Sequence, residues 1–300
     1  MSETPPNSAD HVGAAASGSA FVLTGADYSF GAATAKRAVR CMVALPMAFD
    51  SRRIALQLWT LRDHLKTAED VARSFARVRE IGYEHVQLSG LGPISSAEVK
   101  RLADAAGLGI CATHEDGREI VDEPNKVADT LSTLGCRFTA YPYPHTPLDT
   151  LDQVFELADK LSHAGEVLRS RGQLLTYHNH AIEFRKLGGK AILDWLYERT
   201  DPVMVHGEID TYWVQAGGGD PAGYCARLSG RLPLLHLKDY AITPQNEPIM
   251  AALGEGNLNF PTILREAESA GCEWYIVEQD RGFTDPFEAI ATSLRYLKSL

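Results

Sequence analysis

Short apolar runs alternate with amphipathic segments along the chain from residue 54 onward. The run IALQLW, residues 54–59, is typical of a buried strand, and apolar residues at helical spacing follow it. Two such amphipathic segments begin with pairs that have the spacing of a capping box, Thr67 with Asp70 and Ser95 with Glu98. The pattern therefore predicts strands and helices in alternation.

The same alternation continues to the C-terminus. Further strands are predicted at 85–90, 108–113, 137–141, 173–178, 203–209, 233–238 and 273–278. Helices are predicted at 67–82 and 95–107, and near 125–135, 147–171, 190–200, 220–230, 260–270 and 286–299. Strands that alternate with helices favour parallel pairing, and eight such units predict an α/β fold of the (β/α)8 TIM-barrel type. A doubly wound sheet is the alternative, but no glycine-rich phosphate loop follows an early strand.

Composition and charge argue against several classes of protein and of partner. The chain has 300 residues, 45% of them hydrophobic, and a formal net charge of -10, which argues against nucleic acid as the main partner. No apolar run is long enough to span a membrane. The five cysteines are scattered and form no CxxC pair, so we expect a reducing compartment, the cytoplasm, and no cysteine-based zinc site.

Residues 1–50 differ from the rest of the chain because they are rich in Ala, Gly and Ser and lack periodicity. We interpret them as a disordered N-terminal extension, with the catalytic domain at 51–300. The segment KRAVRCMVALPMAF has the basic and apolar parts of a targeting sequence, but it starts more than 30 residues into the chain and no small-residue cleavage site follows. A true start at Met47 would also explain the extension.

Residues with metal-binding side chains stand at the ends of four consecutive predicted strands. They are His178, Asp210, His236 and Glu278. In a (β/α)8 barrel the carboxyl ends of the strands surround one mouth, so we expect these side chains to converge there. Imidazole and carboxylate ligands without a thiolate suit a divalent ion such as Mn, Mg, Co or Zn.

The chain resembles the sugar isomerase and epimerase family with the xylose isomerase-like barrel. The motifs that carry the resemblance are IALQLWTLRD, EIGYEHVQLSGL, YHNHAIEF, EIDTYWVQAGGGDP, LLHLKD, LGEGNLNF and WYIVEQD, in that order. The resemblance implies a divalent metal held by Asp210, His236 and Glu278. The family's first ligand is a glutamate, and here either His178 replaces it or Glu183 reaches in from the loop. The YHNH variant looks closest to inosose dehydratases and keto-glycoside lyases.

The resemblance also implies a reaction, the enolisation of a keto-sugar or a cyclitol such as an inosose. Gln87 stands where many epimerases have an acid/base glutamate, and because an amide cannot transfer a proton, elimination of water is favoured over epimerisation. An epimerase or isomerase is the alternative, and a catalytically inactive sugar-binding barrel is an alternative of another class. DNA-repair endonucleases share the barrel, but they need a basic surface. Family barrels often pair through outer helices, which leaves a homo-oligomer open.

Roles are assigned to the remaining candidates on the same basis. The acid, base or electrophile candidates are His114, His180, Glu183 and Lys238. The candidate substrate-binding residues are Gln57, Trp59, Gln87, Asn179, Trp213 and Glu255. Lys238 could instead form a salt bridge with Asp239 or Glu255. His206 and Glu208 are interpreted as a buried polar pair or as support for the metal ligands.

Overall fold

Eight parallel strands close into a barrel in the structure, a computed structural model that describes residues 50–300. The strands are β1 (Ile54–Gln57), β2 (His85–Leu88), β3 (Gly109–His114), β4 (Phe138–Tyr141), β5 (Leu174–His178), β8 (Val205–Asp210), β9 (Leu234–Leu237) and β12 (Trp274–Val277). Every predicted strand is present, and the predicted TIM barrel is confirmed. The interpretation of residues 1–50 lies outside the described residues, except for Asp50.

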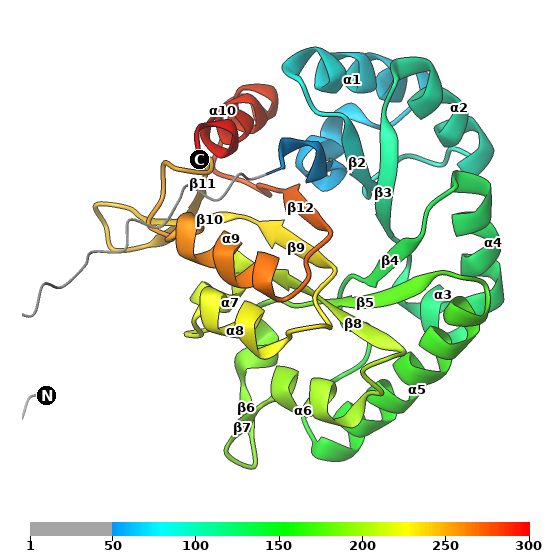
Figure 1. Ribbon diagram of the computed structural model, residues 1–300, viewed down its shortest axis with the longest axis vertical. Coiled ribbons are helices and arrows are strands. Elements are labelled where there is room, and N and C mark those ends of the chain that lie inside the picture. The colour runs from blue at the N-terminus through cyan, green and yellow to red at the C-terminus, as the bar shows by residue number, and fades with distance from the viewer. Residues whose placement is uncertain (1–49) are drawn as a thin grey trace, which may run out of the picture. The chain divides into compact units, whose positions relative to one another are not determined.

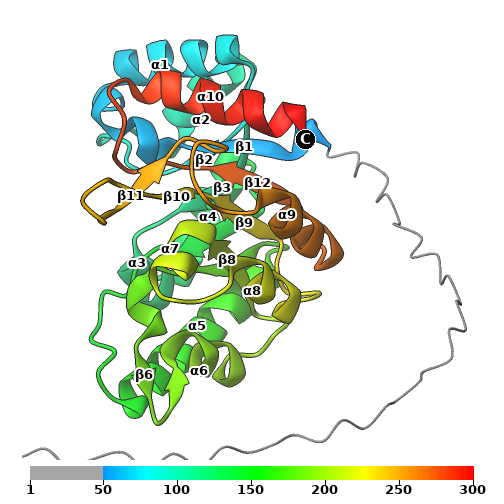
Figure 2. The ribbon, with the colours of Figure 1, turned by 90° about the vertical axis from the view of Figure 1, so that its left-hand side faces the viewer.

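The helices lie around the outside of the strands (Figure 1). They are α1 (Ala68–Ile81), α2 (Ser96–Ala106), α3 (Gly117–Asp122), α4 (Pro124–Leu134), α5 (Leu151–Ser170), α6 (Ile192–Arg199), α7 (Thr211–Ala216), α8 (Pro221–Arg227), α9 (Phe260–Ser269) and α10 (Pro286–Ser299). The last helix lies beside the first, as Figures 1 and 2 both show, because β12 pairs with β1. This pairing closes the barrel.

The structure differs from the predicted elements mainly at the mouth of the barrel. Strand β1 ends at Gln57, and Leu58–His64 form a 3-10 helix, η2, because the Gln57 side chain accepts a hydrogen bond from the Trp59 amide. A two-stranded hairpin, β10 (Asp239–Ile242) with β11 (Pro248–Ala251), follows β9. A short 3-10 helix, η3 (Ala181–Phe184), follows β5, and a second hairpin, β6 (Lys186–Leu187) with β7 (Lys190–Ala191), delays the start of α6. The periodicity of apolar residues along the sequence does not reveal elements as short as these.

The predicted helix starts are confirmed in most details. Thr67 and Asp70 form a reciprocal capping box at the start of α1. At α2 only half of the predicted box forms, because the Ser95 side chain accepts from the Glu98 amide while the Glu98 carboxylate pairs with Arg101. On an exposed surface, a carboxylate can pair with a nearby guanidinium instead of a backbone N–H at little cost in free energy.

Two layers of side chains fill the barrel interior. An apolar cluster separate from the main core contains Ala55, Cys111, Ala112, Phe138, Leu234 and Ile276. Because side chains alternate along a strand, Leu234 shares its face with His236, and Ile276 shares its face with Glu278. The apolar layer therefore lies directly below a polar layer at the carboxyl ends of the strands.

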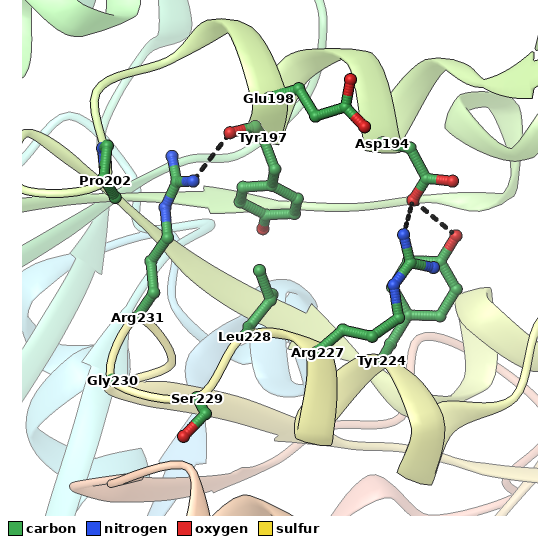
Figure 3. Close-up of a pocket in the computed structure, with 10 residues that line it drawn as sticks. All are labelled: Asp194, Tyr197, Glu198, Pro202, Tyr224, Arg227, Leu228, Ser229, Gly230 and Arg231. Carbon is green, nitrogen blue, oxygen red and sulfur yellow. Dashed lines mark hydrogen bonds and ion pairs between the residues drawn. The ribbon is translucent and has the colours of Figure 1, made fainter.

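A cavity of about 330 Å³ lies at the opposite end of the barrel, where the helix-to-strand loops meet (Figure 3). Its charged groups are already paired within the protein. Arg231 donates to the carbonyl oxygens of Val205, Tyr197 and Thr200, and Arg227 pairs with Asp194. Charge pairing with backbone carbonyls at this end of a barrel serves to fix the loops, and it leaves no unpaired charged group in this cavity.

Four cysteines lie within the described residues. Cys111, Cys136, Cys225 and Cys272 are free and buried, and burial raises the pKa of Cys136 to about 12. Thiols in such surroundings are unreactive. Between residues 50 and 300, no helix combines the length and the apolar character that crossing a membrane requires.

Gly165, in the middle of α5, provides a test of the packing between this helix and the barrel. A methyl group at this position would lie 2.2 Å from the carbonyl oxygen of Met204. Helix propensity alone would make Gly165→Ala stabilising, but overpacking against backbone costs about 1–3 kcal/mol. We therefore expect Gly165→Ala to lower the free energy of unfolding in urea titrations. Glu166→Ala, on the exposed face of α5, is the control, and an unchanged or raised stability for Gly165→Ala would contradict this packing.

Candidate active site

Strand register brings the predicted metal ligands to one level of the barrel. Asp210 on β8 lies opposite His236 on β9, and His236 lies opposite Ile276 on β12, two residues before Glu278. His178 on β5 lies opposite Glu208 on β8. Because all four strands are parallel, their carboxyl ends meet at the same mouth.

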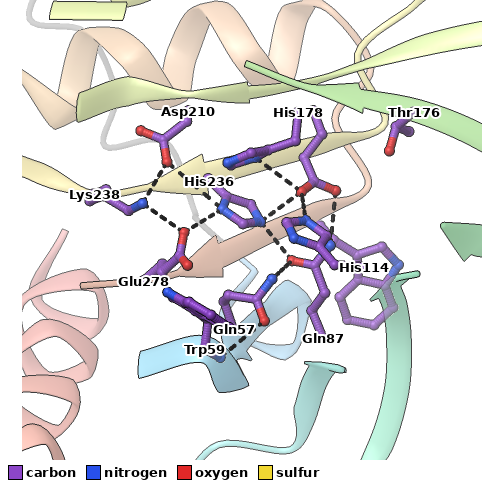
Figure 4. A network of polar contacts seen from close by, with 12 residues as sticks. Gln57, Trp59, Gln87, His114, Thr176, His178, Asp210, His236, Lys238 and Glu278 are labelled. Atoms are coloured by element: carbon purple, nitrogen blue, oxygen red, sulfur yellow. Dashed lines mark hydrogen bonds and ion pairs between the residues drawn. The ribbon is translucent and has the colours of Figure 1, made fainter. Parts of the chain in front are cut away.

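The four side chains are buried and converge (Figure 4). One ligand atom from each of His178, Asp210, His236 and Glu278 lies within 4.8 Å of every other. Nδ1 of His236 is 2.9 Å from Oε2 of Glu278 and 3.9 Å from Oδ2 of Asp210. Glu183 has no atom in this group. Its carboxylate instead accepts from the Tyr177 hydroxyl at 3.0 Å and from the His180 amide at 2.8 Å.

Lys238 is buried among three carboxylates. Its Nζ lies 3.0 Å from Asp210, 2.8 Å from Glu278 and 3.1 Å from Asp280. The suggested salt bridge to Asp239 or Glu255 is wrong. The Asp239 carboxylate accepts from four backbone amides, that of Tyr240 in β10 and those of Gly254, Gly256 and Leu258 in the loop after β11.

Glu208 lies at the centre of the histidine side chains. Its Oε1 is 2.6 Å from Nε2 of His114, 2.8 Å from Nε2 of His236 and 3.3 Å from Nδ1 of His178. Gln87 donates to its other oxygen at 2.9 Å. The suggested pair of Glu208 with His206 does not form, since the partners of Glu208 come from β2, β3, β5 and β9.

Charge and burial shift the pKa values of these groups in opposite directions. Burial disfavours the His236 cation, but Glu208 and Glu278 outweigh burial and raise its pKa to about 10. Burial alone would raise the pKa of Glu278, but Lys238 and His236 hold it well below its ordinary value. Burial, together with the neighbouring Glu278, raises the pKa of Asp280 to about 7.

A cavity of about 660 Å³ opens above the cluster. Its walls include Trp59, His114, His178, His180, Lys238, Glu278 and Asp280. Trp59 is 41% exposed at the rim. His180 lies between the rings of Tyr143 and Trp213, and burial followed by the charge of Lys238 lowers its pKa to about 3. The cavity has the size of a small-molecule site and is lined by hydrogen-bonding groups.

Several predicted substrate-binding residues lie elsewhere. Gln57 and Gln87 are fully buried beneath the cluster and hydrogen-bond to each other at 2.9 Å. Asn179 is buried and accepts from the Asp210 amide at 3.1 Å. The centroid of the Trp213 ring lies 5.5 Å from Nζ of Lys238. Glu255 is exposed and borders a separate cavity beside β10 and β11. Of the predicted set, only Trp59 borders the central cavity.

Glu208 and Asp280 complete the site. The sequence offered two roles for Glu208, a pair with His206 or support for the metal ligands, and its contacts with His178 and His236 fit the second role. Asp280 had no role, yet it lies two residues after Glu278 and reaches both Lys238 and the cavity. The position of Asp280 two residues after Glu278 was the signal that the sequence offered.

The donor set fits a divalent cation. It offers two imidazoles and two carboxylates, all buried, with no thiolate. The carboxylates of Glu208, Asp210, Glu278 and Asp280 outnumber the cationic groups among them, the Lys238 ammonium and the His236 ring. Buried charge of one sign requires compensation, and a divalent ion would supply it.

The family of the chain follows from comparison with known proteins. Residues 75–300 match the model of the xylose isomerase-like TIM barrel. The chain belongs to this family. The resemblance of its motifs to that family is thereby confirmed.

Its relatives are distant in sequence. An inosose dehydratase of Geobacillus thermodenitrificans is 26% identical over 174 residues, which cover 51% of this chain and 56% of the dehydratase. The chain thus spans just over half the length of that relative. The rhizopine catabolism protein MocC of Rhizobium meliloti is 25% identical over 77% of this chain and 81% of its own. Among solved structures, a sugar phosphate isomerase/epimerase from Parabacteroides distasonis aligns with a TM-score of 0.72 at 25% identity, covering 85% of this chain and 96% of that one.

The choice between His178 and Glu183 as first ligand can be tested by metal content. We expect His178→Ala and His236→Ala to lose bound divalent metal, because each removes a nitrogen from the converging group. Glu183→Gln should keep it, since that carboxylate points to Tyr177. Metal is measured by mass spectrometry after dialysis against a metal buffer. Retention in His178→Ala together with loss in Glu183→Gln would reverse the assignment.

Proposed function

We propose that the protein is a divalent-metal-dependent enzyme that enolises a keto-sugar or an inosose and eliminates water from it. One observation carries the proposal: the buried group of His178, Asp210, His236 and Glu278 lies at the floor of a cavity that His180 also lines. A divalent ion held by these four residues would polarise a ketone and stabilise the charge of an enolate. The inosose dehydratase and MocC relatives support a cyclitol or sugar substrate.

His180 is the best-placed base, and its lowered pKa keeps the ring neutral so that it can accept a proton. Among the described residues its Nδ1 has no hydrogen-bond partner, and the flanking rings of Tyr143 and Trp213 limit its rotation. Nε2 is the nitrogen that would take the proton from the carbon next to the ketone. His114 also borders the cavity, but its Nε2 is engaged by Glu208 at 2.6 Å, which suits it to orient substrate. Glu183 does not border the cavity and is a less suitable base.

Lys238 and Asp280 are suited to assist the leaving group. Both border the cavity, and they lie 3.1 Å apart. As the carbon–oxygen bond beside the enolate breaks, this pair would donate a proton to the departing hydroxyl, which leaves as water. The proton removed from carbon stays on His180 until solvent takes it. Atoms and charge therefore balance with one base and one acid.

Elimination is favoured over epimerisation because a second base is lacking at β1 and β2. Those strands contribute Gln57 and Gln87, and both amides lie beneath the cluster. An amide cannot remove or return a proton at ordinary pH. An epimerase needs opposed bases on the two faces of the substrate, and neither β1 nor β2 supplies one.

The reaction is tested with metal-loaded enzyme and a panel of 3-keto sugars and inososes in deuterated water. We expect loss of water and an unsaturated ketone. Deuterium incorporation with inverted configuration and no water loss would show an epimerase instead. No metal and no turnover would favour a sugar-binding barrel without catalysis.

The role of His180 is tested separately. His180→Gln should lower turnover about 100- to 10,000-fold, the usual contribution of a general base, with bound metal unchanged. His163→Gln, on the exposed face of α5, is the matched control and should turn over normally. Equal activity of both variants would remove His180 from the mechanism.

A further inference from the structure

A chain of hydrogen bonds runs beneath the candidate metal ligands. The Trp59 amide donates to Oε1 of Gln57 at 3.3 Å, and Nε2 of Gln57 donates to Oε1 of Gln87 at 2.9 Å. Nε2 of Gln87 then donates to Oε2 of Glu208 at 2.9 Å. Figure 4 shows Gln57 and Gln87 directly below His236.

The two ends of this chain fix the orientation of both amides. A backbone N–H can only donate, so it must face the oxygen of Gln57. A carboxylate can only accept, so Glu208 must face the nitrogen of Gln87. Reversing either amide would place two donors or two acceptors together. The oxygen of Gln87 is therefore the atom that lies 2.6 Å from Nε2 of His236.

Nε2 of His236 consequently faces two acceptors and no donor. They are Oε1 of Gln87 at 2.6 Å and Oε1 of Glu208 at 2.8 Å. A ring nitrogen between two acceptors must carry a hydrogen. The opposite nitrogen, Nδ1, also faces acceptors, the carboxylates of Glu278 at 2.9 Å and Asp210 at 3.9 Å. These two carboxylates belong to the converging group, so a bound cation would take the place of a hydrogen on Nδ1 and not of the one on Nε2.

We propose that Gln57, Gln87 and Glu208 form a positioning unit that keeps the hydrogen on Nε2 of His236 and so presents Nδ1 as its metal-binding atom. The inference rests on the proposed function and adds how the ligand is prepared. An imidazole binds metal through one nitrogen, and the hydrogen bond at the other nitrogen fixes both tautomer and ring angle. Glu208 extends the same control to His114, whose Nε2 lies 2.6 Å away.

A second ion is the competing interpretation of the same residues. Ligand atoms of His114, His178, Glu208 and His236 also lie within 4.8 Å of one another. The contacts of Glu208 with His114 and His236 already have hydrogen-bond lengths. The amide chain accounts for Glu208 and both glutamines together, whereas a second ion leaves the glutamines unexplained.

The proposal is tested by zinc binding and by NMR of the full chain. Nitrogen-15 labelling of histidine, with His236 assigned from a His236→Gln sample, reads the tautomer in the zinc-loaded protein. We expect hydrogen on Nε2 and zinc on Nδ1. Glu208→Gln should weaken zinc affinity about 10- to 100-fold in chelator competition, because the substituted amide can turn a donor toward the histidines. Glu183→Gln, an equally buried carboxylate outside the group, should bind like wild type.

Each outcome bears on a different claim. A wild-type protein that binds no zinc, manganese or magnesium would sink the proposed function itself. Normal metal binding with hydrogen on Nδ1 of His236, or with unchanged affinity in Glu208→Gln, would overturn only the positioning unit. Two ions per wild-type chain and one in Glu208→Gln would make Glu208 a ligand. If Glu208→Gln fails to fold, the tautomer in wild type still decides.

Discussion

The gathering of four carboxylates at one end of the barrel, three of them buried, is the constraint on which the site depends. Glu208 and Asp210 lie on β8, and Glu278 and Asp280 lie in the loop after β12. Taking such groups from water is costly unless each has a cationic or hydrogen-bonding partner. Lys238 serves three of them, and histidines with Gln87 serve the fourth. The polar residues of neighbouring strands follow from this need.

Parallel strand register is what lets these partners meet. Asp210 and His236 are 26 residues apart in sequence but are register partners on adjacent strands. His178 and Glu208 are also register partners on adjacent strands. The apolar layer below, with Leu234 and Ile276, keeps water from the underside of the cluster. The chain at β9 and at β12 therefore serves both layers. Each places an apolar side chain in the lower layer and, two residues later, a polar side chain in the upper layer.

Much of this arrangement could be predicted from the sequence, because strand ends and side-chain alternation are visible there. The eight strands, the convergence of Asp210, His236 and Glu278, and the capping box at Thr67 all follow from periodicity. Contacts between strands are not visible in a single sequence. The sequence makes Gln57 and Gln87 candidate substrate ligands, and only the barrel shows that the polar cluster covers them. The positions of Glu255 and Asp239 depend on the path of the loop after β11. Hydrogen bonds from backbone amides of that loop to the Asp239 carboxylate fix this path.

The paired glutamines have a consequence for the movement of hydrogen ions. Amides can pass on a hydrogen bond but not a proton, and the layer beneath them is apolar. The lower barrel thus insulates the cavity from the opposite end of the protein. Every proton that enters or leaves the cavity must travel through the mouth, where a substrate of the proposed reaction would bind. Substrate closing over Trp59 and His180 would isolate the reacting hydrogen from bulk solvent until the product departs.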